Sequence, residues 1–518
     1  MRKLNIGLAG IGCTILLPSV SALPEGNDKP NIVFILADDL GYGDVSCLNQ
    51  HSGIKTPNID RIALSGITFT DAHSSSAVST PTRYGILTGR YNWRSTLKQG
   101  VLDGFSPALI PSGRKTMASM LKERGYQSAC MGKWHLGWEW NNIDKGSDKV
   151  DYAKPIKNGP TTLGFDYFFG ISASLDMPPY VYVENDRVTA LPDHITEGNN
   201  INYDKPGSDG SYWRKGITGS DFDHRECLPD IIRHAITFID QKSATDDPYF
   251  LYLPLPAPHT PILPSREFQG KSGLNYYADF VMMVDSKVGE ILDAIERSGE
   301  KENTIVVFAS DNGCSPWADF ETLISKGHNP SYIFRGTKAD LFDGGHRIPC
   351  VMRWPGKIKK PFTINQTICL TDFMATFASI TGYSLADNEG EDSYNLLPAI
   401  LNPANKKILR EATVSHSING SFTIRQGDWK LLLAPGSGGW SAPLPGSRQE
   451  EGLPRVQLYN LKDDPSEIQN VQDKYPEVVK KLTALLKRYI ETGRSTNGNP
   501  QKNDGEYPWS QVVDILKN

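Results

Sequence analysis

Two apolar segments of the sequence, residues 31–37 and 304–309, are each followed by side chains that carry oxygen atoms. These side chains are Asp38, Asp39, Asp311 and Asn312. Continuous apolar runs of this length predict strands that are buried on both faces. Open parallel sheets gather their ligands at the carboxyl ends of such strands. Because all four donors are hard oxygens, they predict a calcium site, with magnesium as the lesser option.

A possible nucleophile lies in the segment 79–83, which reads Ser-Thr-Pro-Thr-Arg and is followed by Leu-Thr-Gly-Arg at 87–90. Pro81 suits the first turn of a helix. Ser79 would then lie at the helix entrance, where free backbone N–H groups favour an anion, with Arg83 one turn further on. Taken alone, the same pattern is typical of an ordinary N-cap serine.

Two further segments carry nitrogen side chains that could act as acids or bases. Lys133 and His135 belong to Gly-Lys-Trp-His-Leu-Gly at 132–137, which we place on a loop after a predicted strand at 127–131. An isolated pair of this kind is usually solvated surface. His259 follows a short apolar run at 249–253 and sits among prolines. It is either a proton donor or a structural histidine in a turn.

The elements that position these residues alternate between apolar strands and amphipathic helices. Apolar side chains recur every three or four residues over 277–295, which predicts a helix. After about residue 410 the pattern changes to short strands at 421–425 and 429–433, a Gly/Pro/Ser-rich loop at 435–452 and a helix whose apolar stripe covers 478–489. We therefore predict a large α/β domain over 23–410 and a smaller sheet-plus-helix domain over 411–518.

Composition and the first residues limit the functional class. The chain has 518 residues, 39% of them hydrophobic, and a formal net charge of -5, so it lacks the positive charge that nucleic-acid binding requires. Arg2 and Lys3 precede an apolar run, and Val-Ser-Ala at 20–22 offers a cleavage site, so residues 1–22 predict a signal peptide and an exported protein. The run is too short and too interrupted for a membrane span, and lipid attachment at Cys13 is the weaker alternative.

The six remaining cysteines are scattered and lack metal-ligand spacing, so disulfides and buried thiols both stay open.

The segment at 79–90 resembles the signature of the type I sulfatases, the arylsulfatase A-like branch of the alkaline phosphatase superfamily. The signature has Cys or Ser, any residue, Pro, a small residue and any residue or Arg, then Leu-Thr-Gly; Thr82 stands where Ser or Ala is commoner. In this family the Cys or Ser is oxidised to formylglycine, and the serine form is processed by an anaerobic sulfatase-maturating enzyme. A hydrated aldehyde has two hydroxyls, so one can attack sulfur while the other later expels sulfate.

The resemblance also implies roles for the remaining residues. It implies that the four residues at the strand ends, Asp38, Asp39, Asp311 and Asn312, bind a single calcium ion. It also implies that Lys133 contacts the sulfate and that His135 orients or deprotonates the diol. His259 would protonate the leaving oxygen, alone or with Lys338 of Arg-Gly-Thr-Lys at 335–338. Ser174 is similar to a serine that contacts sulfate. Selectivity would come from His346, the loop at 315–329 and the loop that contains Trp440.

The fold implied by the resemblance is α/β: a large mixed sheet sandwiched by helices, with a C-terminal domain that holds a four-stranded antiparallel sheet and a helix. The implied activity is hydrolysis of sulfate monoesters, with an exo-acting carbohydrate sulfatase of the bacterial periplasm, acting on host or dietary glycans, as the expected form. The substrate would be a small-molecule or oligosaccharide sulfate ester. Two alternatives stay open: a phosphatase or phosphodiesterase that uses unmodified Ser79, and a catalytically silent glycan-binding relative.

Overall fold

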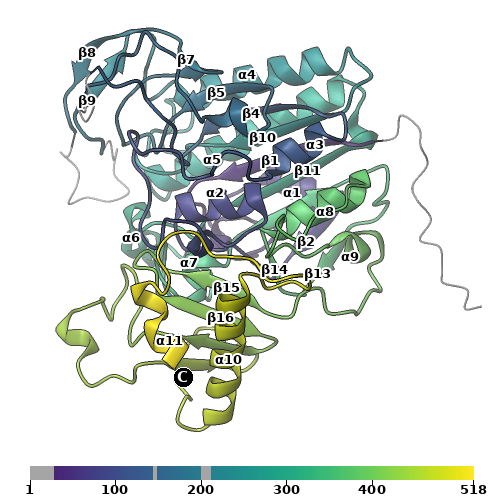
Figure 1. The fold of residues 1–518 in the computed structure, drawn as a ribbon. Coiled ribbons are helices and arrows are strands. Elements are labelled where there is room, and N and C mark those ends of the chain that lie inside the picture. The colour runs from purple at the N-terminus through teal and green to yellow at the C-terminus, as the bar shows by residue number, and fades with distance from the viewer. Residues whose placement is uncertain (1–28, 144–148, 200–211, 518) are drawn as a thin grey trace, which may run out of the picture.

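The computed structural model describes residues 29–143, 149–199 and 212–517 (Figure 1). The predicted signal peptide and Cys13 lie outside the described residues. Within them, no helix is long and apolar enough to cross a bilayer. All six cysteines in this range carry free thiols, and every one except Cys47 is buried.

A ten-stranded mixed sheet forms the centre of the large domain, with the order β13-β2-β12-β11-β1-β10-β4-β5-β6-β7. β1 (Asn31–Ala37) pairs in parallel with β10 (Tyr249–Pro254) and β11 (Thr304–Ser310). β12 (Cys350–Arg353) runs antiparallel to β11 and makes the sheet mixed. The other strands are β2 (Gly66–Phe69), β4 (Gln127–Lys133), β5 (Tyr167–Ile171), β6 (Val183–Glu184), β7 (Arg187–Val188) and β13 (Phe362–Ile364).

Helices cover both faces of this sheet. Alternate side chains of β1 point to opposite faces, so each set packs against a different group of helices. Val33 and Ile35 pack in a core with α1, α4 and α5, whereas Ile32 and Phe34 pack in a second core with α2, α3, α8 and α9. The helices of the large domain are α1 (Pro57–Leu64), α2 (Ser79–Thr88), α3 (Met117–Lys122), α4 (Cys227–Lys242), α5 (Tyr276–Arg297), α6 (Phe320–Ser325), α7 (Asp343–His346), α8 (Asp372–Thr381) and α9 (Leu397–Leu401).

The C-terminal part forms a second layered unit, at the bottom of Figure 1. Its four-stranded antiparallel sheet has the order β15-β16-β17-β18 and packs against α10. Two small pairs, β14 with β3 and β8 with β9, complete the strands. The bounds are β15 (Thr413–His416), β16 (Phe422–Gln426), β17 (Trp429–Leu432), β18 (Gln457–Asn460), α10 (Pro476–Thr492), α11 (Val513–Lys517), β3 (Ala72–His73), β14 (Ile368–Cys369), β8 (Pro192–Thr196) and β9 (Gly216–Gly219).

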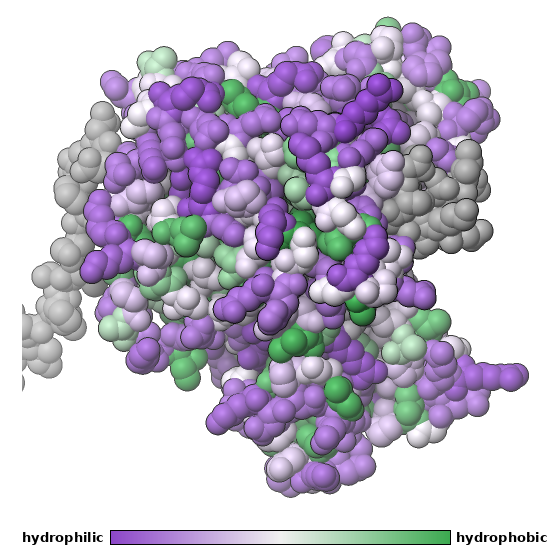
Figure 2. Space-filling model, turned by 180° about the vertical axis from the view of Figure 1, so that it is seen from behind, coloured by the Kyte–Doolittle hydropathy of each residue, from purple (hydrophilic) through white to green (hydrophobic). Residues whose placement is uncertain are grey.

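The predicted fold class is therefore confirmed: a mixed sheet between helices is followed by a small four-stranded antiparallel sheet with a helix. One detail differs. The strand predicted over 127–131 continues through Lys133, because Gly132 and Lys133 pair in parallel register with β5. Seen from behind, the surface is largely hydrophilic, with apolar side chains in small, separate groups (Figure 2).

Candidate active site

The carboxyl ends of β1 and β11 bring the oxygen-bearing side chains together. Ala37 and Ser310 are register partners, so the residues that follow them are neighbours across the two strands. The Asn312 Nδ2 amide donates to Asp39 Oδ1 at 2.7 Å, and the Asp39 backbone N–H donates to Asp311 Oδ1 at 3.2 Å. These residues and Asp38 are buried. Four side chains with oxygen atoms thus lie together at the carboxyl ends of two central strands.

Ser79 faces this group from the first turn of α2. Its hydroxyl Oγ lies 3.3 Å from Asp38 Oδ1, 3.5 Å from Asn312 Oδ1 and 3.3 Å from Lys133 Nζ. The N-cap of α2 is Val78, and no side chain caps the helix. The interpretation of Ser79 as an ordinary N-cap serine is therefore wrong. Its hydroxyl points to Asp38 and Asn312 of the four strand-end residues, which we term the acidic group, and not to the helix backbone.

Three cations neutralise three buried carboxylates. Arg83 donates to Asp311 Oδ2 at 2.8 and 3.2 Å. In the same way, Lys133 donates to Asp38 at 2.7 Å, and Lys338 to Asp39 at 2.8 Å. Each buried carboxylate thus has its own cation, which avoids the large free-energy cost of an unpaired buried charge.

The same cations keep the carboxyl groups of Asp38 and Asp39 ionised. Burial by itself would raise the pKa of Asp38, but nearby positive charges, Lys133 first among them, outweigh it and lower that pKa. Burial likewise opposes ionisation of Asp39, and Lys338 and His259 reverse the effect, so the pKa of Asp39 is also lowered. Both carboxylates are therefore ionised at neutral pH, as metal ligands must be.

His135 presents an unpartnered nitrogen. Burial, aided by the charges of Lys133 and Arg83, lowers the pKa of His135 well below its ordinary value, so the imidazole is neutral. Its Nε2 lies 2.7 Å from the Leu102 carbonyl oxygen and must carry the proton, because a carbonyl only accepts. Nδ1 is then an unprotonated acceptor, and it is buried with no hydrogen-bond partner. This nitrogen is suited to receive a proton from a bound group.

His259 lies on the other side of the acidic group, nearer to solvent. Its Nε2 is 3.6 Å from Asp39 Oδ2, and its side chain is 11% exposed. Nδ1 lies 2.6 Å from the Thr260 carbonyl oxygen, which fixes the ring. Ligand atoms of Asp38, Asp39 and His259 lie within 4.8 Å of one another, so His259 is also placed where it could contact a metal ion.

The loop after β5 contributes Ser174, which the resemblance implies as a sulfate contact, and two polar side chains that the sequence did not indicate, Ser172 and Asp176. The hydroxyls of Ser172 and Ser174 and the Oδ1 of Asp176 are buried and have no hydrogen-bond partner. Asp176 Oδ1 is 4.0 Å from His259 Nδ1, and Asp176 Oδ2 accepts from Arg214 at 2.5 Å. Asp38 directly follows β1, whereas β5 ends at Ile171 and Asp176 lies further along the loop, so the strand-end pattern does not identify Asp176.

The backbone is held in uncommon conformations at three positions in or beside this site. Asp39, His135 and Ala339 have φ values of 66°, 56° and 80°. Non-glycine residues with positive φ are uncommon and collect at functional sites. Gly132 explains part of the motif around Lys133: a Cβ there would lie 1.9 Å from the Pro254 carbonyl oxygen, so only glycine lets β4 approach β10 so closely.

Trp440 reaches the rim of the site from the C-terminal domain. Buried Asp340 holds this loop, since its Oδ1 accepts from the backbone N–H of Trp440 at 2.7 Å and of Ser441 at 3.0 Å. The indole remains 43% exposed, and Lys338 Nζ lies 5.9 Å from its centre. Asp340 thus fixes the backbone at Trp440, and the indole lies beside Lys338 and is open to solvent.

His346 does not offer a ring nitrogen to the site. Its Nδ1 lies 2.9 Å from Nδ1 of His73, and its Nε2 donates to the Leu341 carbonyl oxygen at 3.0 Å. The side chain is buried. The direct role in selectivity expected for His346 is therefore replaced by a structural one, because both nitrogens already have protein partners.

His346 belongs instead to a second buried charged group, which we term the interdomain cluster. Its members are Asp71, His73, Asp343, His346, Lys430 and Glu467. Lys430 comes from the C-terminal sheet and pairs with Asp343 and Glu467 at 2.7 Å each. The cluster therefore joins the two domains through buried ion pairs.

The chemistry of the donor set fits a hard divalent cation. The four strand-end side chains supply carboxylate and amide oxygens, the ligands that Ca²⁺ takes in proteins. The surrounding Arg83, Lys133 and Lys338 provide positive charge for an anion next to Ser79. The arrangement can thus hold a cation, bind an anionic ester, and place a proton acceptor and a proton donor on different sides of it.

Comparisons with known proteins agree with this geometry. Residues 30–383 match the protein family described as Sulfatase. The chain is 35% identical to the N-acetylgalactosamine-6-O-sulfatase of Bacteroides thetaiotaomicron, over 89% of this chain and 93% of that protein. It is 27% identical to the N-acetylgalactosamine-6-sulfatase of Rattus norvegicus, over 94% and 91%. A solved structure from work on glycosaminoglycan metabolism by Bacteroides thetaiotaomicron superposes with a TM-score of 0.78 at 34% identity, covering 89% of this chain and 99% of that one.

Proposed function

The chain belongs to the sulfatase family, and from this premise we propose that it is an exo-acting carbohydrate sulfatase that removes the 6-sulfate of N-acetylgalactosamine from host or dietary glycosaminoglycans. Hydrolysis of sulfate esters follows from the family match over residues 30–383. The sugar and the sulfate position are proposed from the similarity to the N-acetylgalactosamine-6-O-sulfatase of Bacteroides thetaiotaomicron. Following the predicted signal peptide, we place the enzyme in the bacterial periplasm.

The observation that carries the proposal is the position of the Ser79 hydroxyl. It lies within 3.5 Å of oxygen atoms of Asp38 and Asn312 and 3.3 Å from Lys133 Nζ. We propose that an anaerobic sulfatase-maturating enzyme oxidises Ser79 to formylglycine, whose hydrate supplies the nucleophile. Burial at the first turn of α2 then keeps the reacting group away from bulk water.

Residues around position 79 have separate tasks in the proposed reaction. Lys133 neutralises charge on the sulfate oxygens. His135 accepts a proton at its free Nδ1, because its Nε2 proton is held by the Leu102 carbonyl. His259, on the more exposed side, donates a proton to the leaving sugar oxygen, with Lys338 beside it.

We propose that Asp38, Asp39, Asp311 and Asn312 hold one calcium ion. A bound Ca²⁺ would supply positive charge that stabilises the sulfate oxygens during attack. Arg83 supports this site by holding Asp311 in place through two hydrogen bonds. We assign His259 to proton transfer and Ser174 to the sulfate; the buried Ser174 hydroxyl has no hydrogen-bond partner among the described residues.

A sugar as the leaving group is supported by Trp440. An exposed indole, whose backbone is held by Asp340 and which lies beside Lys338, offers a flat apolar face at the rim. Sugar rings present C–H groups on one face and hydroxyls at their edges, so they pack well on aromatic side chains with a fixed orientation. A small sulfate ester without a ring would gain nothing from this contact.

Release of sulfate from a set of defined sulfated sugars tests the proposal. The set contains N-acetylgalactosamine and N-acetylglucosamine, each with sulfate at position 4 or 6, as monosaccharides and at both ends of oligosaccharides. We expect release from N-acetylgalactosamine 6-sulfate at chain ends. Faster release from another sugar, from another position or from internal units would overturn the substrate assignment.

Parallel assays with the phosphate esters of the same sugars separate this function from that of a phosphatase. The enzyme must be produced together with its maturating enzyme, because unmodified protein would be inactive for a trivial reason. Phosphate turnover that exceeds sulfate turnover in such material would contradict the proposal.

A further inference from the structure

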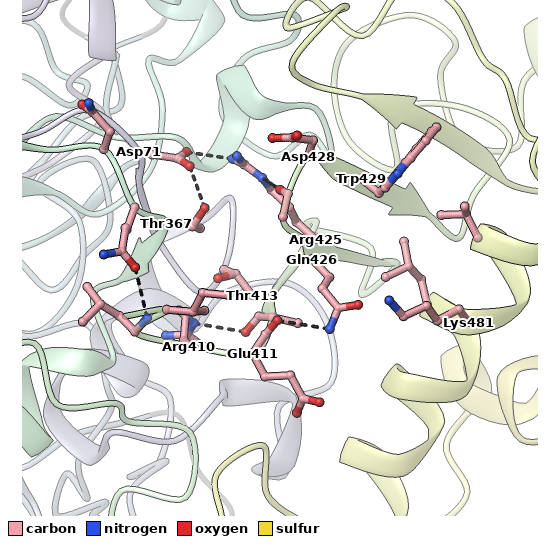
Figure 3. A pocket seen from close by; sticks show the side chains of 18 residues that line it. Asp71, Thr367, Arg410, Glu411, Thr413, Arg425, Gln426, Asp428, Trp429 and Lys481 are labelled. Carbon is pink, nitrogen blue, oxygen red and sulfur yellow. Dashed lines mark hydrogen bonds and ion pairs between the residues drawn. The ribbon is translucent and has the colours of Figure 1, made fainter. Parts of the chain in front are cut away.

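A cavity of about 660 Å³ lies where the C-terminal sheet meets the large domain, away from Ser79 (Figure 3). Its lining includes Asp71, which follows β2, and residues of β16, β17 and α10. β2 is three strands from β1 in the sheet order, which separates the two sites by roughly 14 Å along the sheet. A volume of this size is typical of pockets that bind small organic ligands.

The base of this cavity is rigid and polar. Arg425 is 13% exposed and is held by Asp71 Oδ1 at 2.7 Å and by the Gly427 carbonyl oxygen at 3.0 Å. Arg410 is buried and hydrogen-bonded to Tyr91 and to Asp372. The two guanidinium groups at the base are therefore held in place by ion pairs and hydrogen bonds.

One wall offers an aromatic ring and a cation. Trp429 is partly exposed and packs against Tyr475, with ring centres 4.9 Å apart, so its orientation is set. Lys481 of α10 is exposed beside it, and no described residue pairs with its ammonium group. On the same side, Asp428 is exposed and its carboxylate has no partner among the described residues. Figure 3 shows Trp429 and Lys481 on the side opposite Asp71.

This combination matches a glycan better than other ligands. An aromatic face suits the C–H side of a sugar ring, a free carboxylate accepts hydrogen bonds from hydroxyls, and a free ammonium pairs with a sulfate or a uronate. The remaining charges of the lining are already paired: Arg425 with Asp71, Arg410 with Asp372, and Glu411 with Arg488. Among the described residues of the lining, Lys481 is therefore the cation that is left to pair with an anionic group of the ligand.

We propose that this cavity is a second glycan-binding site, which holds an internal segment of an anionic polysaccharide while a chain end enters the site at Ser79. The choice of polysaccharide rests on the proposed function, but binding at the second site does not require catalysis. Holding the polymer would raise the local concentration of chain ends at the catalytic site.

Affinity electrophoresis of the full-length Ser79→Ala protein tests the proposal. The probe is a polysaccharide of alternating hexuronate and N-acetylgalactosamine 6-sulfate, immobilised in the gel. We expect Lys481→Glu to weaken binding about tenfold, because it replaces one ion pair by a repulsion. Lys480→Glu is the matched control, since Lys480 is exposed on the same helix but does not line the cavity, and it should change binding less than twofold.

Turnover by the matured enzyme with Ser79 in place gives an independent readout. Lys481→Glu should raise KM for the polysaccharide and leave the hydrolysis of a monosaccharide sulfate unchanged. Trp429→Phe, which keeps an aromatic ring, should retain most of the binding, and Trp429→Ala should lose it. Equal losses for Lys481→Glu and Lys480→Glu, no loss for either, or equal retention by an uncharged polysaccharide would overturn the proposal. Polysaccharide binding is measured in the Ser79→Ala protein without any turnover. The test of the second site therefore remains valid even if the sugar assigned to the catalytic site proves wrong.

Discussion

The buried group around Ser79, proposed above to be catalytic and termed the catalytic cluster, contains the same kinds of side chain as the interdomain cluster. The catalytic cluster comprises Asp38, Asp39, Ser79, Arg83, Lys133, His135, Ser174, Asp176, His259, Asp311, Asn312 and Lys338. The two clusters differ in which buried polar atoms are left without hydrogen-bond partners. Each has buried carboxylates, histidine and lysine, and each brings three possible metal-ligating residues together. In the interdomain cluster both nitrogens of His346 and the ammonium of Lys430 are taken by protein partners. Around Ser79, by contrast, His135 Nδ1, Ser174 Oγ and Asp176 Oδ1 are buried and unpartnered.

This difference shows which feature marks a site for chemistry. Buried polar atoms in folded proteins almost always have partners, so several unpartnered atoms gathered around one possible nucleophile indicate a place for a ligand. Backbone conformation does not separate the two clusters, because positive φ values occur at Asp39 and His135 in one and at Glu467 in the other. Residue types alone would have ranked the two clusters equally.

Ser79→Ala should have the largest effect on activity and almost none on stability, which is the reverse of what we expect for a change in the interdomain cluster. Loss of the nucleophile should reduce sulfate-ester turnover by at least about four orders of magnitude. The thermal midpoint should stay within a degree or two, as the side chain is small and contributes no helix cap. Residual turnover above one per cent of the parent rate would place the nucleophile elsewhere.

Asp311→Ala tests whether the oxygen donors act as one metal site. We expect loss of bound calcium and a fall in activity of about a thousandfold, since the charge supplied by a metal is worth several kcal/mol in such a reaction. Metal analysis of the purified protein, beside an activity assay, measures both. Because Asp311 also holds Arg83, Asp311→Asn serves as the milder control. Full calcium content in the alanine variant would show that the ligand set is wrong.

His259→Ala sharpens the assignment within the catalytic cluster. A proton donor matters when the leaving oxygen is a poor leaving group, so sugar sulfates should slow about a hundredfold and activated aryl sulfates less than tenfold. The kcat values for the two substrate types, measured on the same preparation, decide the question. Equal losses would indicate that His259 binds metal or substrate and does not donate a proton.

Lys430→Met addresses the interdomain cluster. Removing this cation leaves Asp343 and Glu467 buried without their shared partner, which should reduce the free energy of unfolding by about 3–5 kcal/mol. Urea denaturation measures this loss, with exposed Lys462→Met as the control. The folded variant should keep its kcat within about twofold. A large loss of kcat without loss of stability would assign the cluster to catalysis.

Trp440→Ala should have the smallest effect. Without the exposed ring, KM for the sugar substrate should rise about fivefold, in line with the loss of roughly 1 kcal/mol of aromatic packing, while kcat and the hydrolysis of small aryl sulfates change little. Trp440→Phe should restore most of the affinity. An unchanged KM for the sugar would remove Trp440 from the substrate site.

Features set by local pattern could be predicted from the sequence. The apolar run at 31–37 coincides with β1, and the periodic helix at 277–295 lies within α5 (Tyr276–Arg297). The strand-end acids and the segment around Ser79 could be read because each is a short continuous motif.

Features that depend on contacts between distant segments could not be predicted. The bond between His346 and His73 joins residues 273 positions apart, and the contact between Asp340 and Trp440 spans 100. Neither contact leaves a local signal, so the sequence by itself gives no indication that His346 is structural or that Asp340 holds the loop at Trp440. The extension of β4 through Lys133 also depends on its pairing with β5.

The central claim is that the acidic group at the strand ends surrounds a nucleophile made from Ser79. It is tested most directly by mass spectrometry of the peptide that contains residue 79, in enzyme preparations of graded activity. The account predicts that the fraction of peptide lacking two hydrogen atoms, or carrying the hydrated aldehyde, rises in proportion to specific activity. Fully active enzyme with an unmodified serine at position 79 would contradict it.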